Sequence, residues 1–270
     1  MTLYSSHRMY DVTPSVAALW EALYARVSAL AGVPLAPLHM PPPTPIDALW
    51  ARPDLGLAQM CGWPFHRADP QPTPLAAPVP DAAEAGGRPV YWSDMVVRAD
   101  APYTRLEDTF GTRIAWTVEG SHSGFNAPRR LLLDAARETG GPLYAESVGP
   151  VVTPRGAIES VLEGRADIAP VDGFFLLLLR RHEPELAARI RVIAQTPQAP
   201  LPLLVASPGV PEATVAALRA ALLALDTDAE AAPLMADLCL RRFVPVDPAA
   251  YAEGQHWHED ALAAGYPRPA

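Results

Sequence analysis

The sequence contains no lysine, and all 21 of its basic residues are arginines. Without a lysine amine the chain cannot form a Schiff base on its own side chains, which excludes pyridoxal-phosphate chemistry. Positive charge is also scarce, because 30 acidic residues give a formal net charge of −9. A chain without a basic face has nothing to follow the phosphates of a nucleic acid. We therefore exclude nucleic acid as a partner.

Long apolar runs are absent as well. The longest, residues 174–179, is far shorter than the roughly 18–20 residues that a membrane span needs, so no membrane insertion is expected. Residues 1–8 lack the basic segment followed by an apolar one that is typical of a secretory signal. The protein is therefore expected to be cytoplasmic, or periplasmic if a leader is missing from the sequence.

Cysteine is equally sparse. Cys61 and Cys239 lie far apart and predict neither a disulfide framework nor a metal site. Cys61 is expected to be a small buried residue rather than a nucleophile, because neither sequence neighbour would activate it. The chain shows no coherent set of acid, base and nucleophile, so we expect no enzyme, no catalytic residue and no cofactor.

The residues that are present form an alternating pattern. Half of the chain is hydrophobic and 19% is charged, which is typical of a folded globular protein. Short β-favouring runs alternate with segments whose apolar residues recur at helical spacing. This pattern predicts an α/β fold, in which ligands bind at the carboxyl ends of strands. The expected strands are residues 35–40, 55–60, 91–98, 114–118, 144–148, 166–172, 190–194 and 203–207. The segment 67–89 is expected to hold one or two short strands inside long loops.

The stretch between residues 114 and 136 is expected to organise the binding site. A short strand is followed by a turn of glycines, serines, a histidine and an asparagine, and a helix begins near Pro128. The unsatisfied N–H groups and the dipole of a helix N-terminus attract anions, so the turn predicts an anion site. The alternative is a helix that Ser121 or Ser123 caps and that binds nothing.

Two enzyme motifs are excluded in the same stretch. The spacing from Gly120 to Gly124 is similar to that of a nucleophile elbow, but its centre is His122 rather than serine. No Gly-Lys-Ser/Thr follows, so the turn is not a phosphate-binding loop of the nucleotide-hydrolase type.

The order of elements and motifs resembles the substrate-binding components of ABC importers of the phosphonate, phosphate and sulfonate type. The resembling segments span most of residues 8–207, and their order and spacing are more specific than any single motif. They are Met9-Tyr10-Asp11, Gln59-Met60-Cys61-Gly62-Trp63-Pro64, residues 96–100, residues 106–111, Ser121-His122-Ser123-Gly124-Phe125-Asn126 and residues 161–172.

The resemblance implies a two-lobed type II periplasmic-binding-protein fold with a hinged ligand cleft. Lobe I would comprise residues 1–97 and 205–270, and the inserted lobe II residues 98–204. The implied ligand-binding residues are Tyr10, Trp63, Ser121, His122, Ser123, Gly124, Asn126 and Asp172. The family often has Gly-Ser-His before the helix at 157–164, where this chain has Thr153-Pro154-Arg155. Arg155 can supply a positive charge in place of that histidine.

Four of the candidate residues also suit ordinary structural roles. Tyr10 and Trp63 fit a ligand platform and core packing equally well. Asp11 is expected to cap a helix rather than bind ligand. Asp172 can also cap the helix that follows it, although its place in the motif favours contact with an amine of the ligand.

The histidines predict no metal site. His256 and His258 would share one face of a strand, but the tail looks helical, and residues two apart on a helix diverge. We therefore expect them to be a surface feature. The histidines elsewhere, in loops or near helix ends, indicate no site.

Two functions remain open from the sequence. The resemblance implies a monomeric solute-binding protein that captures a small anionic or zwitterionic ligand, phosphonate- or phosphate-like, and delivers it to an ABC permease. The alternative is a cytoplasmic enzyme or metabolite sensor on the same fold, as in thiamine-pyrimidine or menaquinone-precursor biosynthesis.

Overall fold

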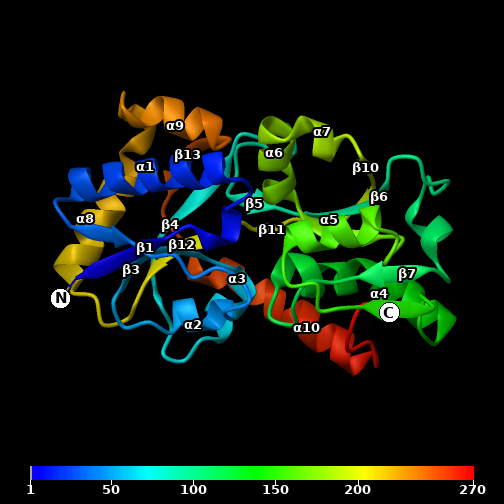
Figure 1. Ribbon diagram of the computed structural model, residues 1–270. Coiled ribbons are helices and arrows are strands. Elements are labelled where there is room, and N and C mark those ends of the chain that lie inside the picture. The colour runs from blue at the N-terminus through cyan, green and yellow to red at the C-terminus, as the bar shows by residue number, and fades with distance from the viewer. Residues whose placement is uncertain (1) are drawn as a thin grey trace. The chain divides into compact units, whose positions relative to one another are not determined.

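The computed structural model describes residues 2–270, which divide into two compact units (Figure 1). Unit 1 comprises the chain up to Val90 together with Pro200–Tyr251, and unit 2 comprises Tyr91–Ala199 and Ala252–Ala270. The chain passes between the units three times, at the short paired strands β5 (Val90–Tyr91) and β11 (Ala199–Pro200) and again between Tyr251 and Ala252.

The division differs from the predicted lobes mainly at the C-terminus. The two inner boundaries lie a few residues before the predicted ones, but the last 19 residues belong to unit 2 and not to unit 1. The reason is packing: helix α10 (Glu253–Ala263) lies against α4 (Ala127–Thr139), and its Ala261 is part of the hydrophobic core of unit 2.

Unit 1 is built on a mixed sheet. Within residues 2–270 it has six strands in the order β13-β4-β12-β3-β1-β2. Strands β1, β2 and β3 are parallel, and β12 and β13 are antiparallel to their neighbours. The carboxyl ends of β1, β2 and β3 therefore meet at one edge. The strands are β1 (Leu3–Ser6), β2 (Leu35–Pro37), β3 (Leu55–Met60), β4 (Thr73–Pro80), β12 (Leu203–Ala206) and β13 (Leu240–Val244).

Strand β4 is longer and more central than the sequence predicts. Its eight residues pair with β12 on one side and β13 on the other, although three of them are prolines. Proline has no N–H to donate to a ladder, and the register of β4 shifts against both partners. Buried Leu75 and Val79 hold the strand in the core despite these interruptions.

Helix α1 (Pro14–Ala31) is the longest helix of unit 1, and its ends lie where the sequence predicts them, at Thr13 or Ser15 and at Gly32. The Thr13 hydroxyl accepts a hydrogen bond from the Val16 N–H at 3.0 Å, and Gly32 ends the helix with a φ of 63°. The other helical segments of the unit are η1 (Arg8–Tyr10), α2 (Ile46–Trp50), α3 (Gly62–Arg67), η2 (Ala83–Ala85), α8 (Glu212–Leu223), η5 (Leu225–Thr227), α9 (Ala231–Asp237) and most of η6 (Pro248–Ala252).

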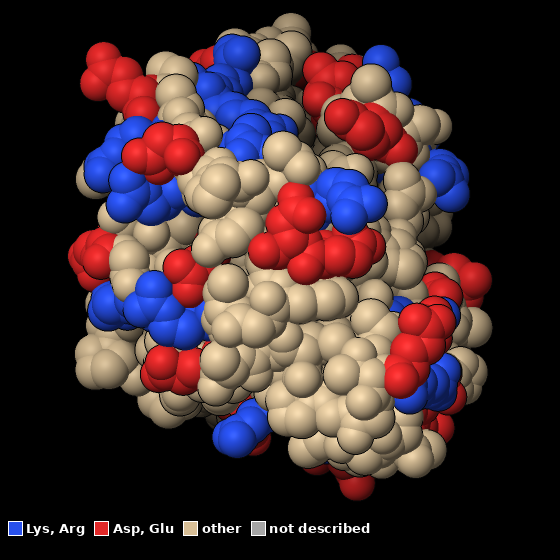
Figure 2. Space-filling view, turned by 90° about the vertical axis from the view of Figure 1, so that its right-hand side faces the viewer, with Lys and Arg blue, Asp and Glu red and all other residues tan. Residues whose placement is uncertain are grey.

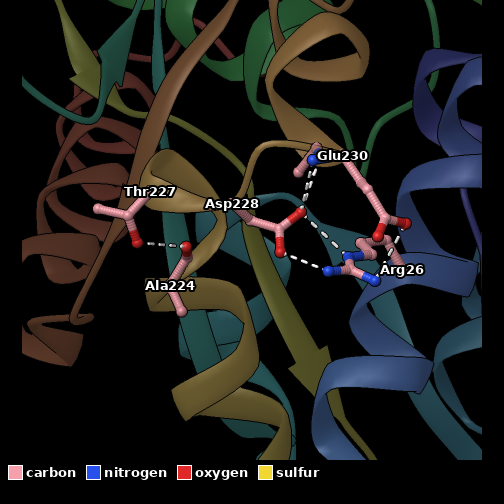
Figure 3. Close-up of polar contacts among 6 residues, drawn as sticks. Arg26, Ala224, Thr227, Asp228 and Glu230 are labelled. Carbon is pink, nitrogen blue, oxygen red and sulfur yellow. Dashed lines mark hydrogen bonds and ion pairs between the residues drawn. The ribbon is translucent and has the colours of Figure 1, made fainter.

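An ion-pair cluster attaches α1 to the turn before α9 (Figure 3). The Arg26 guanidinium donates to both carboxylate oxygens of Asp228, at 3.0 and 2.6 Å, and lies 3.1 Å from Glu230. Asp228 Oδ1 also accepts from the Ala231 N–H at the start of α9. Hydrogen bonding to Arg26 is the main cause that lowers the pKa of Asp228.

Unit 2 has an antiparallel sheet of order β10-β6-β9 and a parallel pair, β7 and β8. Its core combines the two through Val97, Ile114, Leu132 and Ile168. The strands are β6 (Ser93–Arg98), β7 (Arg113–Ala115), β8 (Glu146–Val148), β9 (Ala169–Asp172) and β10 (Ile190–Gln195). The helices besides α4 and α10 are η3 (Leu106–Thr109), η4 (His122–Asn126), α5 (Pro154–Leu162), α6 (Gly173–His182) and α7 (Pro184–Ala187).

No helix within residues 2–270 has the length and apolar character that a membrane span requires. On the face that Figure 2 shows, acidic and basic side chains are interspersed and no extended basic area is visible.

Candidate functional site

The predicted strand, turn and helix are present in unit 2. Strand β7 ends at Ala115, and the turn that follows is a single π-helical turn, η4, which continues directly into α4. The Ser121 side chain accepts a hydrogen bond from the Gly124 N–H at 2.9 Å. Ser121 is therefore the cap at the start of the turn, and the positive end of the helix dipole lies at this turn.

Gly124 is held against Thr117. The Thr117 N–H donates to the Gly124 carbonyl at 3.2 Å, and a Cβ on Gly124 would lie 2.0 Å from Thr117 Oγ1. Only glycine allows this close approach. The Thr117 hydroxyl is buried and has no hydrogen-bond partner among residues 2–270. The turn thus presents one polar group that the described chain leaves unsatisfied.

His122 is the second such group. Its side chain is buried between aromatic rings, 5.3 Å from Trp257 in a stacked arrangement and 6.2 Å from Tyr91. Burial lowers its pKa to about 4, because a charged imidazolium would lose its hydration. The ring is therefore neutral at pH 7. Its Nε2 atom is buried without a hydrogen-bond partner among residues 2–270.

A hydrogen-bond network assigns the tautomer of this neutral ring. Arg129 only donates, and its Nη2 lies 2.8 Å from Asn126 Oδ1, which fixes the orientation of the amide. The Asn126 Nδ2 then donates to the Gly254 carbonyl at 2.7 Å and faces His122 Nδ1 at 3.4 Å. Since Nδ1 receives this hydrogen bond, the ring proton is on Nε2. His122 thus has a buried N–H donor with no acceptor in the described chain.

Arg129 places a positive charge beneath the turn. Its guanidinium stacks on the Phe125 ring at 4.6 Å and donates to the Pro267 carbonyl at 3.0 Å. Burial lowers its pKa to about 10, which still leaves it charged at neutral pH. A buried cation next to a helix N-terminus favours an anion in the same place.

The neighbouring strands bring one further predicted residue, Asp172, to the turn. Ser93 of β6 donates its hydroxyl hydrogen to the carbonyl oxygen of Ser123 at 2.7 Å, and it is the register partner of Asp172 on β9. Asp172 Oδ1 accepts from the N–H groups of Phe174 and Phe175, both at 3.0 Å, so Asp172 caps α6. Six of the eight predicted ligand residues are therefore collected within unit 2.

The other two lie in unit 1 and are buried. The Tyr10 ring, at the end of η1, stacks on Trp20 at 6.5 Å. Trp63 is in the first turn of α3, with the Arg67 guanidinium 5.1 Å from its ring centroid. Both rings thus have packing partners in their own unit, and their contact with ligand stays a prediction.

Two further charged residues, Arg155 and Asp11, are paired with other groups. Arg155, the expected substitute for a family histidine, forms an ion pair with Glu183 at 3.0 Å. Asp11 does not cap a helix; its carboxylate bonds the His7 ring. Thr13 caps α1 instead.

Three residues of the site are not predicted from the sequence, namely Thr117, Arg129 and Trp257. The sequence does contain a signal for Trp257, because it lies between His256 and His258. In α10 those histidines diverge as expected: His256 is exposed, whereas His258 Nδ1 lies 2.8 Å from an Arg129 nitrogen. No sequence pattern connects α10 with the turn at residue 122.

Solved structures share the fold of this chain. The chain is similar to a binding protein component of an ABC phosphonate transporter from Pseudomonas aeruginosa, with 16% identity, a TM-score of 0.81 and coverage of 97% of this chain and 88% of that chain. It is similar to PhnD1 from Prochlorococcus marinus in complex with methylphosphonate, with 17% identity, a TM-score of 0.76 and coverage of 97% and 98%. XAC2383 from Xanthomonas citri bound to ATP has 17% identity and a TM-score of 0.66, with coverage of 98% of both chains. The fold is that of the two-lobed periplasmic binding proteins.

The family follows from the sequence match. Residues 13–251 match the family described as ABC transporter, phosphonate, periplasmic substrate-binding protein, and the chain belongs to this family. A comparison with curated protein sequences finds no match. Family membership confirms the predicted resemblance and fold class. The family consists of transport binding proteins and not enzymes, and its members bind a small molecule and work with an ABC permease.

Proposed function

We propose that this chain captures a small oxyanion of the phosphonate or phosphate type in the periplasm and delivers it to an ABC permease. The methylphosphonate in the similar PhnD1 structure supports this class of ligand. In unit 2 the ligand oxygens would meet the turn at residues 121–126. Tyr10 and Trp63 would supply the contacts from unit 1.

The observation that carries the proposal is the buried His122 Nε2–H without an acceptor. A buried donor that makes no hydrogen bond costs about 1–3 kcal/mol, so a binding site is one place where such a group persists. A phosphonate or phosphate oxygen is a strong acceptor and would satisfy it. The Thr117 hydroxyl, also buried and without a partner in the described chain, is a second donor for the same ligand.

The electrostatics of the turn favour an anion over a neutral ligand. The start of α4 directs its backbone dipole at residues 121–126, and Arg129 keeps its charge beneath them. Asp172 is the one acidic residue among the eight predicted ligand-binding residues. If the ligand also carries an amine, as an aminoalkylphosphonate does, Asp172 is the group that would accept its hydrogen bond.

A thermal-shift screen tests the ligand class. The panel is phosphate, phosphite, sulfate, alkyl- and aminoalkylphosphonates and sulfonates. A ligand at 100 times its Kd adds about 2.7 kcal/mol to the free energy of unfolding, which raises the melting temperature measurably. We expect a phosphonate or phosphate to give the largest shift and to be recovered unchanged. A panel without any shift contradicts the proposed ligand class, and consumption of the ligand would indicate an enzyme.

A variant pair tests the site. His122→Ala removes the buried donor, and a lost hydrogen bond to a charged ligand weakens binding by about 10- to 100-fold. The control is His256→Ala, because His256 is an exposed histidine of the same unit. Calorimetric titration should show a loss of affinity for the first variant and none for the control. Equal affinity in the unaltered chain, His122→Ala and His256→Ala would contradict a role for His122 in the site.

A further inference from the structure

A second cluster of polar side chains lies in unit 1, at the edge where parallel strands end. His7 follows β1 and His39 follows β2, its parallel neighbour. The Leu38 N–H donates to the Ser5 carbonyl at 2.8 Å, so the two strand ends stay side by side up to these histidines. Glu21 extends from α1 to the same place.

Two of the three distances between the ligand atoms of this cluster match those around a bound metal ion. Glu21 Oε1 lies 3.4 Å from His7 Nε2 and 3.3 Å from His39 Nε2. A tetrahedral ion with bonds of about 2.0–2.1 Å separates neighbouring ligand atoms by about 3.3–3.4 Å. Among residues 2–270 this is the one group of three His, Cys, Asp or Glu side chains whose ligand atoms all lie within 4.8 Å of one another.

Asp11 gives the cluster a further feature of metal sites. Its carboxylate accepts a hydrogen bond from His7 Nδ1, on the far side of the ring from Glu21. This bond places a proton on Nδ1, so the ring atom available to an ion is Nε2, which faces Glu21. Histidine ligands in proteins are commonly oriented by a carboxylate in this way.

Exposure fits an ion that enters from solvent. The His7 side chain is 4% exposed, whereas Glu21 and His39 are 41% and 63% exposed. The buried histidine is held by Asp11, and the two exposed groups can close over an ion. The nearby Arg8 guanidinium donates to the Thr44 carbonyl, so it is directed to the backbone and not to Glu21.

We propose that His7 Nε2, Glu21 Oε1 and His39 Nε2 bind one divalent transition-metal ion, with Zn²⁺ as the preferred ion. Two imidazoles and one carboxylate suit Zn²⁺, whereas Mg²⁺ and Ca²⁺ prefer ligand sets made of oxygen alone. Three protein ligands leave a fourth position for water. All three ligand atoms belong to unit 1, whereas the turn at residues 121–126 belongs to unit 2.

Metal titration of the tag-free, metal-stripped full chain tests the proposal. Calorimetry should show one Zn²⁺ per chain, and Co²⁺ should give the visible absorption of a tetrahedral ion. His39→Ala and Glu21→Gln each remove a ligand atom from an exposed side chain, so the fold should survive, which the melting temperature checks. Each should weaken Zn²⁺ binding by more than the roughly 10- to 100-fold expected for Asp11→Asn, which removes only the orienting partner.

The control is His66→Ala, because His66 is an exposed histidine of unit 1 outside the cluster. It should bind Zn²⁺ like the unaltered chain. The proposal is overturned if the unaltered chain binds no Zn²⁺ at micromolar concentration. It is also overturned if His39→Ala binds Zn²⁺ as tightly as His66→Ala does.

Discussion

A neutral histidine can favour an anion without carrying a charge. His122 is buried beside Trp257, and Asn126 holds its proton on Nε2. A charged imidazolium in this place would need a partner when no ligand is bound, whereas a neutral ring loses only one hydrogen bond. The positive charge comes instead from Arg129, whose high pKa keeps it protonated. The hydrogen-bond donor, His122, and the positive charge, Arg129, are thus on different residues.

The low pKa of His122 predicts how stability depends on pH. In the unfolded chain His122 is protonated as the pH falls through about 6.5, whereas in the folded chain it is protonated only near pH 4. The contribution is therefore fully present above pH 6.5 and is lost as the pH falls towards 4, by about 3 kcal/mol in all. His122→Gln should flatten the pH dependence of unfolding in urea between pH 6.5 and 4. The exposed His256→Gln should leave it unchanged, and an equal slope in all three proteins would contradict a buried neutral His122.

A substitution of Gly124 gives a second prediction at the residue scale, on stability. A methyl group at this position would meet Thr117 Oγ1 at 2.0 Å and Thr117 Cβ at 2.8 Å. Gly124→Ala should therefore destabilise the protein by about 1–3 kcal/mol in urea unfolding, as overpacked sites do. Gly120, four residues earlier, has nothing within 4 Å of the corresponding point, so Gly120→Ala is a matched control with little effect. Similar stability of the two variants would mean that the turn is not held against Thr117.

Single elements differ in how far the sequence determines them. Helix α1 is predicted from Thr13, Pro14 and Gly32 because local capping chemistry decides its ends. The buried strand β3 is predicted with its bounds, since six consecutive buried residues leave no competing pattern. The π-helical turn is not predicted, because no local sequence signal marks it; within it, Gly124 packs closely against Thr117. Strand β4 is predicted only as fragments, since prolines interrupt the ladder of a central strand, and here both partners shift register against it.

Among single elements, we expect the largest loss of stability and affinity from a change in helix α10. Trp257 is 6% exposed and stacks on His122, and the Gly254 carbonyl accepts from Asn126. Trp257→Ala should cost about 3–5 kcal/mol of stability, as the loss of a buried tryptophan does. It should also weaken oxyanion binding and raise the pKa of His122, because the ring becomes hydrated. Leu262→Ala on the same helix is the control, since Leu262 is 50% exposed. Equal stability and equal affinity in the two variants would contradict a role for α10 in the site.

At the scale of the whole molecule, the sequence predicts the class of fold and the turn that holds most of the candidate site. Ser121, His122, Gly124 and Asn126 are predicted there because strand, turn and helix follow one another in the chain and because the family resemblance implies their contact with ligand. Trp257 is not predicted, because its contact with the turn joins segments that are 135 positions apart. The same long-range packing assigns residues 252–270 to unit 2. Periodicity describes single elements, so neither fact could be read from it.

The central claim is that His122 donates its Nε2–H to a phosphonate or phosphate oxygen. The most direct measurement is the ¹H–¹⁵N spectrum of the histidine rings during titration with the phosphonate or phosphate that gives the largest thermal shift, with His122 assigned by its loss in His122→Gln. We predict a neutral Nε2–H form at pH 7 and a shift of that proton signal which saturates together with binding. A ligand that saturates the protein while the His122 signals stay in place would contradict the account.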